Sequence, residues 1–287
     1  MRILEYISQE KCNVKQILKN HYHMTSGFIT KLKYHGGLFV NGISVRTCDV
    51  LNEGDTLTIF CPKSDSETIE RVDGELDILY EDEDVLCVNK PSGMPTHPSQ
   101  NHHSDTLANI VYNYLLKSDD EIHIVTRLDN YTSGIVLIAK NSYSASIMCT
   151  KEYNQIIDKE YVGICRGIYE SKSGLIDKPI ARCDDSIIKR CVSSLGKQAK
   201  TGYEVVETVG EDSIVKFKLY TGRTHQIRVH CQSIGHPLLN DFLYDEYANP
   251  DKIFSLHCEK ITFTHPVSRE IKTVSAKVPK QFYDDIF

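Results

Sequence analysis

The chain has 287 residues and a formal net charge of −6, so we expect one large or two smaller domains, and the acidic balance excludes a protein that coats nucleic acid indiscriminately. Its apolar runs are shorter than the roughly 18 residues of a membrane span and its N-terminus lacks a signal-peptide pattern, which predicts a cytoplasmic protein without a membrane partner. The ten cysteines include no CxxC and no paired metal spacing, so we expect reduced thiols and no metal site.

Residues 1–63 are predicted to form a small N-terminal module of two helices and a hairpin. Apolar residues at helical spacing mark the helices, at Val14, Ile17 and Leu18 and then at Phe28, Ile29 and Leu32. A strand at residues 38–40 runs into Asn41 and Gly42, a dipeptide favoured in two-residue hairpin turns. Further strands are predicted at residues 43–45 and 56–60.

This order of two helices, a VNG hairpin and a GD turn resembles the S4 RNA-binding domain. Lys31 and Lys33 edge the second helix and are candidate phosphate contacts, the alternative being a solvated helix face. Residues 64–76 have many charges and few apolar side chains, which predicts an acidic linker before a catalytic domain at 77–287. Three Lys/Arg oppose thirteen Asp/Glu between residues 66 and 125, so the acidity is concentrated there.

The segment that begins Arg127-Leu128-Asp129 sets an arginine and a carboxylate in a turn between two runs rich in β-branched residues, 122–125 and 135–139. Those runs are predicted to be covered strands, and loops at the ends of buried strands often carry catalytic residues. Burial raises the pKa of a carboxyl group and a neighbouring arginine lowers it, so an arginine would keep a desolvated Asp129 negative. The alternative is a structural pair that closes the turn.

Beyond this turn the pattern predicts helical structure at 141–154 and strands at 157–165 and 213–220. Thr224 is predicted to cap a helix that runs through Ile227, Cys231 and Ile234 and ends near Gly235 and Pro237. The order suits an α+β fold, with a mixed, mostly antiparallel sheet flanked by helices.

Four sequence blocks stand in a fixed order from about residue 78 to residue 279. They are the strand pair that ends in Lys90-Pro91-Ser92-Gly93, the octapeptide from Arg127 to Gly134, Lys159-Glu160-Tyr161, and the stretch TGRTHQIRVH at 221–230 followed by IGHPL. Together they resemble the RluA-type pseudouridine synthases, which isomerise uridine in RNA. The resemblance implies the fold of that family, with its cleft across the sheet, an RNA partner and no cofactor.

By this resemblance Asp129 is the nucleophile, Tyr161 lies against the target base, and Arg228 pairs with Asp129 through a bidentate fork. Arg127 is expected to fill the stack vacated by the flipped base or to contact phosphate, the alternative being that it only closes the loop. Lys90, Arg223 and Ile227 are placed with the RNA-binding residues. The family usually has histidine before the arginine, where this chain has Thr126.

An ionised carboxylate is sufficient as the central catalyst of the isomerisation. Attack at C1′, a glycal-like route and addition to uracil C6 all remain open. Two other classes are also open: a non-catalytic RNA-binding or ribosome-assembly protein on the same scaffold, and a glycoside hydrolase, which usually needs a second carboxylate. The S4-like module favours ribosomal RNA as the substrate, and we expect a monomer.

Overall fold

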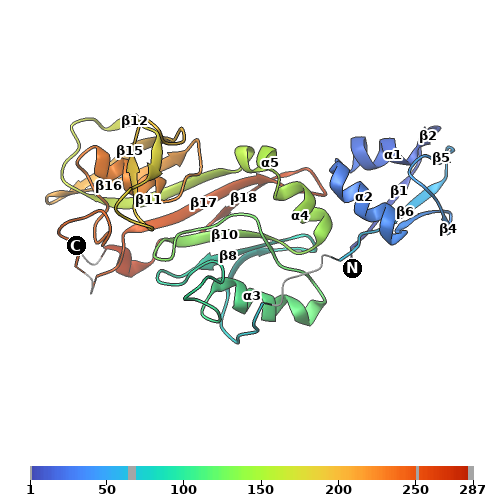
Figure 1. The fold of residues 1–287 in the computed structure, drawn as a ribbon, viewed down its shortest axis with the longest axis horizontal. Helices are drawn as coiled ribbons and strands as arrows, with labels where there is room; N and C mark the ends of the chain where they lie inside the picture. Colours follow the sequence, from blue (N-terminus) through green and yellow to red (C-terminus); the bar gives the residue numbers. More distant parts are fainter. Residues whose placement is uncertain (1, 64–68, 250–251, 284–287) are drawn as a thin grey trace.

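The computed structural model describes residues 2–63, 69–249 and 252–283, and Figure 1 shows the course of the chain. The N-terminal module stands beside the end of the large sheet that carries α4 (Figure 1). Among the described residues, no helix is both long and apolar enough to cross a membrane.

The N-terminal module contains the predicted helical turns and hairpin, and three strands more than expected. Its elements are β1 (Ile3–Ile7), β2 (Cys12–Asn13), α1 (Val14–Gln16) with a π-helical turn (Ile17–His21), α2 (Ser26–His35), β3 (Leu38–Val40), β4 (Ile43–Ser44), β5 (Val50–Leu51) and β6 (Thr56–Phe60). Four strands form one sheet in the order β1-β6-β3-β4. Asn41 and Gly42 both have positive φ angles, as a tight hairpin between β3 and β4 requires.

The large sheet has ten strands, and all of its described strand pairs but one are antiparallel. In chain order the strands are β7 (Asp77–Glu81), β8 (Val85–Lys90), β9 (His123–Ile124), β10 (Ser133–Ala139), β11 (Asp158–Arg166), β12 (Ser173–Asp177), β15 (Lys200–Val209), β16 (Asp212–Leu219), β17 (Leu256–Thr264) and β18 (Ile271–Ser275). The main path is β12-β15-β16-β11-β17-β10-β8-β7, and only β10 with β17 is parallel. The predicted mixed, mostly antiparallel sheet is confirmed.

Helices flank this sheet, also as predicted. They are α3 (Leu107–Leu115), α4 (Ser142–Met148), α5 (Lys151–Ile156) and α6 (Gln226–Ser233), with 3-10 turns at Leu116–Ser118 and Lys280–Tyr283. A short hairpin of β13 (Ile180–Arg182) and β14 (Arg190–Val192) lies against α6. The helical stretch expected at 141–154 is broken into two helices at Cys149 and Thr150, because the Thr150 hydroxyl caps α5 by accepting the Tyr153 N–H.

Strand register aligns four residues across the middle of the sheet. Lys90 on β8 faces Gly134 on β10, Gly134 faces Cys258 on β17, and Cys258 faces Tyr161 on β11. Gly134 has a φ angle of +111°, and a side chain there would meet the Cys258 backbone oxygen at 2.3 Å. Only glycine therefore lets β17 come this close to the strand that follows the Asp129 loop.

The N-terminal module contacts α4 through buried polar groups. The Tyr143 hydroxyl donates to the Tyr22 carbonyl at 3.0 Å, and Ser142 donates to the Pro62 carbonyl. Arg2 pairs with Asp84 at 2.9 Å. These contacts give the module a defined place against the sheet.

The predicted acidic linker lies partly outside the described residues, which resume at residue 69. The described part runs along α3, where Asn109 donates to the Glu70 carbonyl and Asn113 to the Asp73 carboxylate, both at 2.8 Å. The methylene of Gly74 faces Ile110 on the same helix.

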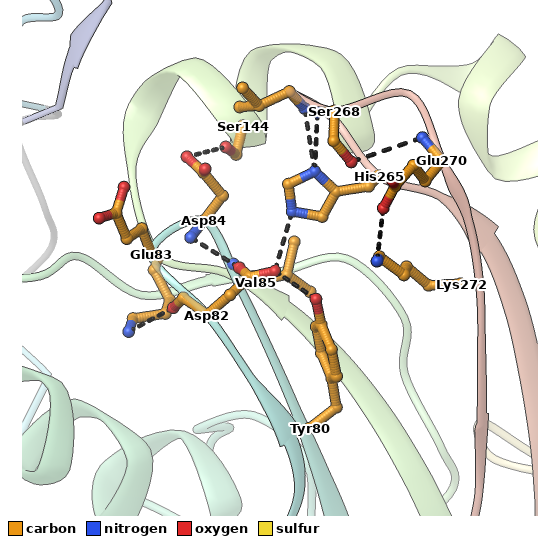
Figure 2. A network of polar contacts seen from close by, with 12 residues as sticks. Tyr80, Asp82, Glu83, Asp84, Val85, Ser144, His265, Ser268, Glu270 and Lys272 are labelled. Carbon is orange, nitrogen blue, oxygen red and sulfur yellow. Dashed lines mark hydrogen bonds and ion pairs between the residues drawn. The ribbon is translucent and has the colours of Figure 1, made fainter.

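A polar network joins the β7–β8 turn to the β17–β18 turn (Figure 2). Asp82 accepts the backbone N–H groups of Asp84 and Val85 and the Tyr80 hydroxyl. The Nδ1 atom of His265 accepts backbone N–H groups, so its Nε2 atom carries the proton that faces Asp82 at 3.0 Å. Burial alone would raise the pKa of Asp82, but these hydrogen bonds outweigh it and hold the pKa well below its usual range.

Donor atoms of Asp82, Asp84 and His265 lie within 4.8 Å of one another, which is close enough to hold a cation. The oxygens of Asp84, however, already accept from Asn141, Ser144 and Arg2. The Arg2 guanidinium also supplies positive charge. Hydrogen bonding within the chain therefore accounts for this group of residues.

We expect Asp82→Asn to lower the free energy of unfolding by about 2 kcal/mol at pH 7, since it removes a carboxylate that accepts several hydrogen bonds. The depressed pKa in the folded state stabilises the protein above the unfolded pKa of roughly 4, and this stabilisation disappears as the pH falls further. Urea unfolding at pH 7 and pH 3 measures both effects, and the difference from wild type should shrink at pH 3. Glu83→Gln is the control, because the Glu83 side chain is 81% exposed; equal losses in both variants would contradict the assignment.

Candidate active site

The Asp129 loop is attached to the segment that follows β8. The Thr96 hydroxyl donates to the Leu128 carbonyl at 2.8 Å, and Gly93 N–H donates to the Asn130 carbonyl at 3.1 Å. Ser92 donates to the Tyr131 carbonyl at 2.6 Å. The loop is thus held on both sides of Asp129, whose side chain remains 30% exposed.

Lys90 lies in the interior, which corrects its expected place beside the RNA. It has no exposed surface, and its ammonium group donates to the carbonyls of Pro91, Met94 and Asn130 at 2.7–2.9 Å. Burial lowers its pKa to about 7, an effect that the Asp129 charge partly opposes. Lys90 therefore ties the β8 exit to the Asp129 loop and is not available to a phosphate.

Arg228 on α6 reaches Asp129, but its bidentate partner is another residue. Its fork donates to both carboxylate oxygens of Asp241, with Nε and Nη2 at 2.8 and 2.7 Å, while Nη1 stands 3.6 Å from Asp129 Oδ2. The expected bidentate pair of Arg228 with Asp129 is thus wrong. Asp241, with no exposed surface, was missed because nothing near it in the sequence marks it as the partner of an arginine thirteen residues earlier.

Pairing with Asp241 keeps the Arg228 guanidinium positively charged in a poorly solvated part of the protein. Burial would lower the pKa of Arg228, but the hydrogen bonds and charge of Asp241 outweigh burial and raise it. The guanidinium carbon lies 5.0 Å from the ring centre of Tyr244 and 5.2 Å from that of Phe254. Aromatic faces favour a cation at this range, so Asp129 meets a fixed positive charge.

His225 also faces Asp129, a role that its neighbours in the sequence did not reveal. It precedes α6 with a φ angle of 58°, in place of the expected Thr224 cap, and its side chain does not cap the helix. Its Nε2 lies 3.9 Å from Asp129 Oδ2 and its Nδ1 lies 2.9 Å from the Tyr244 hydroxyl. Burial lowers its pKa, an effect that the Asp129 charge opposes, so burial favours the uncharged imidazole.

Tyr161 lies at the centre of the sheet and is 5% exposed. Burial raises its pKa well above 10, and its hydroxyl meets the Cys258 thiol. The charge of Asp129 adds to this rise. The hydroxyl therefore keeps its proton at neutral pH.

The other predicted residues divide between surface and core. Arg127 and Arg223 are exposed, and Arg223 donates to the Gln198 carbonyl at 3.0 Å. Ile227 is 4% exposed and packs in the core, so its assignment to the RNA-binding residues is wrong, because almost none of its side chain is accessible. Lys31 and Lys33 are exposed on α2 of the N-terminal module.

Thr126, which replaces the histidine usual in the family, has a local role in the backbone. Its side chain is buried, and its hydroxyl accepts the Leu137 N–H at 3.0 Å. The hydroxyl thus satisfies an amide where the chain enters the Asp129 turn, without touching Asp129.

Comparison with known proteins gives one consistent result. The family model described as RNA pseudouridylate synthase matches residues 84–233. A Bacillus subtilis protein named Uncharacterized RNA pseudouridine synthase YjbO is 38% identical, over 88% of this chain and 90% of that protein. Ribosomal large subunit pseudouridine synthase D of Buchnera aphidicola is 35% identical over 73% of this chain and 71% of its own length.

A solved structure agrees with the sequence relatives. Human RNA Pseudouridylate Synthase Domain Containing 1 superposes with a TM-score of 0.61 at 27% identity, over 75% of this chain and 87% of that chain.

Proposed function

Because this chain belongs to the RNA pseudouridylate synthase family, we propose that it isomerises uridine in ribosomal RNA and that Asp129 is its catalytic carboxylate. The observation that carries the proposal is the pairing of Asp129, on a loop held on both sides, with a buried guanidinium 3.6 Å away. The relative named for the large ribosomal subunit supports ribosomal RNA as the substrate class.

The reaction breaks the N-glycosidic bond, turns the uracil and rejoins it through C5. Asp129 is the nucleophile in this proposal, whether it attacks C1′, assists a glycal route or adds to C6. Arg228 places a fixed positive charge 3.6 Å from the Asp129 carboxylate, where it can orient the nucleophile.

The target base must first leave its stack, at a cost of a few kcal/mol. Tyr161 offers a flat ring and a hydroxyl that stays protonated. Arg127, which is exposed two residues before Asp129, is in a position to fill the vacated stack or contact a phosphate. Arg223 is a second exposed cation close to α6 for the RNA backbone.

We also propose that residues 1–63 are an S4-like RNA-binding domain, joined by residues 64–76 to a catalytic domain at 77–287. The exposed Lys31 and Lys33 on α2 support a phosphate contact there. We further propose that the protein is a monomer and acts in the cytoplasm.

A glycoside hydrolase is disfavoured by the state of Asp241, the carboxylate that shares Arg228 with Asp129. Such enzymes use two carboxyl groups on either side of the scissile bond. Asp241 is the carboxylate next to the site, but it has no exposed surface and both of its oxygens accept from Arg228. It cannot face a sugar.

Mapping of pseudouridine in total RNA tests the substrate class. We expect one or a few uridines of ribosomal RNA to lose the modification in cells that lack this chain and to regain it when the wild-type gene returns. Return of the Asp129→Asn variant is the control and should restore none. Loss confined to transfer RNA would contradict the proposed substrate.

A further inference from the structure

Two exposed aromatic rings contact each other, one on the Asp129 loop and one next to Asp241, the partner of Arg228. Tyr131 follows Asp129 by two residues and is 41% exposed, and Phe242 follows Asp241 and is 53% exposed. Their ring centres lie 5.0 Å apart with the planes at 70°. Single exposed apolar residues are common on protein surfaces, but these two are brought together by the same contacts that build the reaction site.

The position of Phe242 links the pair to the reacting groups. Its ring centre is 5.8 Å from the guanidinium carbon of Arg228, whose Nη1 stands 3.6 Å from Asp129 Oδ2. Tyr131 has its carbonyl held by Ser92, so its place relative to Asp129 is restrained as well. Through Arg228, Phe242 is thus linked to Asp129, and Tyr131 lies on the same loop as Asp129.

The chemistry of the surroundings identifies what the rings would bind. A strand whose uridine has been turned out of its stack exposes the faces of the neighbouring bases, and aromatic side chains stack on such faces whatever the base. The exposed Arg127 on the same loop suits the phosphate that joins these nucleotides. A single-stranded nucleic acid has flat bases for the two rings and an anionic backbone for Arg127. An apolar peptide would suit only the rings.

We propose that Tyr131 and Phe242 form a stacking site for a base that flanks the target uridine. This site rests on the proposed function, because it needs an RNA strand that enters at Asp129. Its role is to bind and position the strand, so loss of the rings raises KM while the chemical step continues.

A fluorescence experiment tests stacking directly. The chain has no tryptophan, so Phe242→Trp introduces a single indole at the site. We expect a single-stranded 15-nucleotide oligouridylate to quench its emission, and an abasic ribose-phosphate strand of equal length to quench it far less. Ile271→Trp is the matched control, on the 75% exposed Ile271 of β18. Equal quenching by both strands, or none at concentrations that saturate binding by filter retention, would overturn the proposal.

A kinetic experiment separates the rings from the catalytic carboxylate. Tyr131→Leu and Phe242→Leu keep an apolar side chain but remove the ring, and each is expected to raise KM about tenfold with kcat nearly unchanged, on RNA extracted from cells that lack this chain. Tyr131→Phe keeps the ring and should behave as wild type.

The two proposals fail in different ways. A wild-type protein that forms no pseudouridine contradicts the proposed function, whereas an active wild type with unchanged KM in both leucine variants contradicts only the stacking site. The indole reporter in an Asp129→Asn background should still be quenched, since stacking does not require turnover.

Discussion

Asp129→Asn is expected to abolish pseudouridine formation, by at least about 10⁴-fold, because an amide cannot act as the nucleophile in any of the three routes. Release of tritium from RNA labelled at uracil C5 measures the loss. The fold should persist, since Asp129 is 30% exposed and Arg228 keeps its bidentate partner, Asp241. We expect the free energy of unfolding to change by less than about 1 kcal/mol.

The matched control for this variant is Glu170→Gln, which removes one exposed carboxylate from the turn after β11. It should retain wild-type tritium release. Equal activity of Asp129→Asn and wild type would show that another group is the nucleophile. Wild-type protein that binds RNA without forming pseudouridine would favour the non-catalytic alternative.

Arg228→Lys is the second variant with a large expected effect. Lysine keeps one positive charge but cannot form the planar fork, so Asp241 loses a hydrogen bond inside the protein. We expect the free energy of unfolding to fall by about 3 kcal/mol and kcat to fall about 100-fold, because the positive charge is no longer held in a fixed position beside Asp129. Chemical denaturation and single-turnover tritium release measure the two effects separately.

Arg166 provides the comparison for that variant, since it makes a similar fork to buried Asp245, at 3.0 and 2.7 Å, and within the described residues its hydrogen bonds do not involve Asp129. Arg166→Lys should lower stability, by less than Arg228→Lys because its side chain is 34% exposed, and should leave kcat within a few-fold of wild type. If both variants lost kcat to the same extent, the role of Arg228 would be structural only.

Local patterns predicted the hairpin, the strands beside the Asp129 turn and α6, but they gave no prediction for β12–β15, β17, β18 or α3. Continuous burial of Ser133–Ala139 agrees with the β-branched run that predicted a covered strand, and Asn41 with Gly42 makes the predicted hairpin. The pattern missed β1, whose five residues include only one buried side chain and which is held by pairing with β6, more than fifty residues later. The sequence of β1 alone contains no pattern that predicts this long-range pairing.

The candidate site also combines features that local sequence predicts with features that depend on distant segments. The motif around Asp129 was recognisable because its chemistry resides in neighbouring residues, and the family assignment agrees with it. The partner of the Arg228 fork, the approach of His225 and the burial of Lys90 were not recognisable, because each depends on where a distant segment lies.

Residue order alone specified the family, the candidate catalytic carboxylate Asp129 and the elements with a clear periodic pattern, since these depend on side-chain chemistry and on periodicity over a few residues. Three-dimensional packing settled which charges meet. Asp241 holds Arg228, Lys90 is enclosed by three carbonyls, and Tyr131 reaches Phe242 across more than a hundred residues. Hydrogen bonds and desolvation act over a few ångströms in space, so they follow the arrangement of the folded chain and not distance along it.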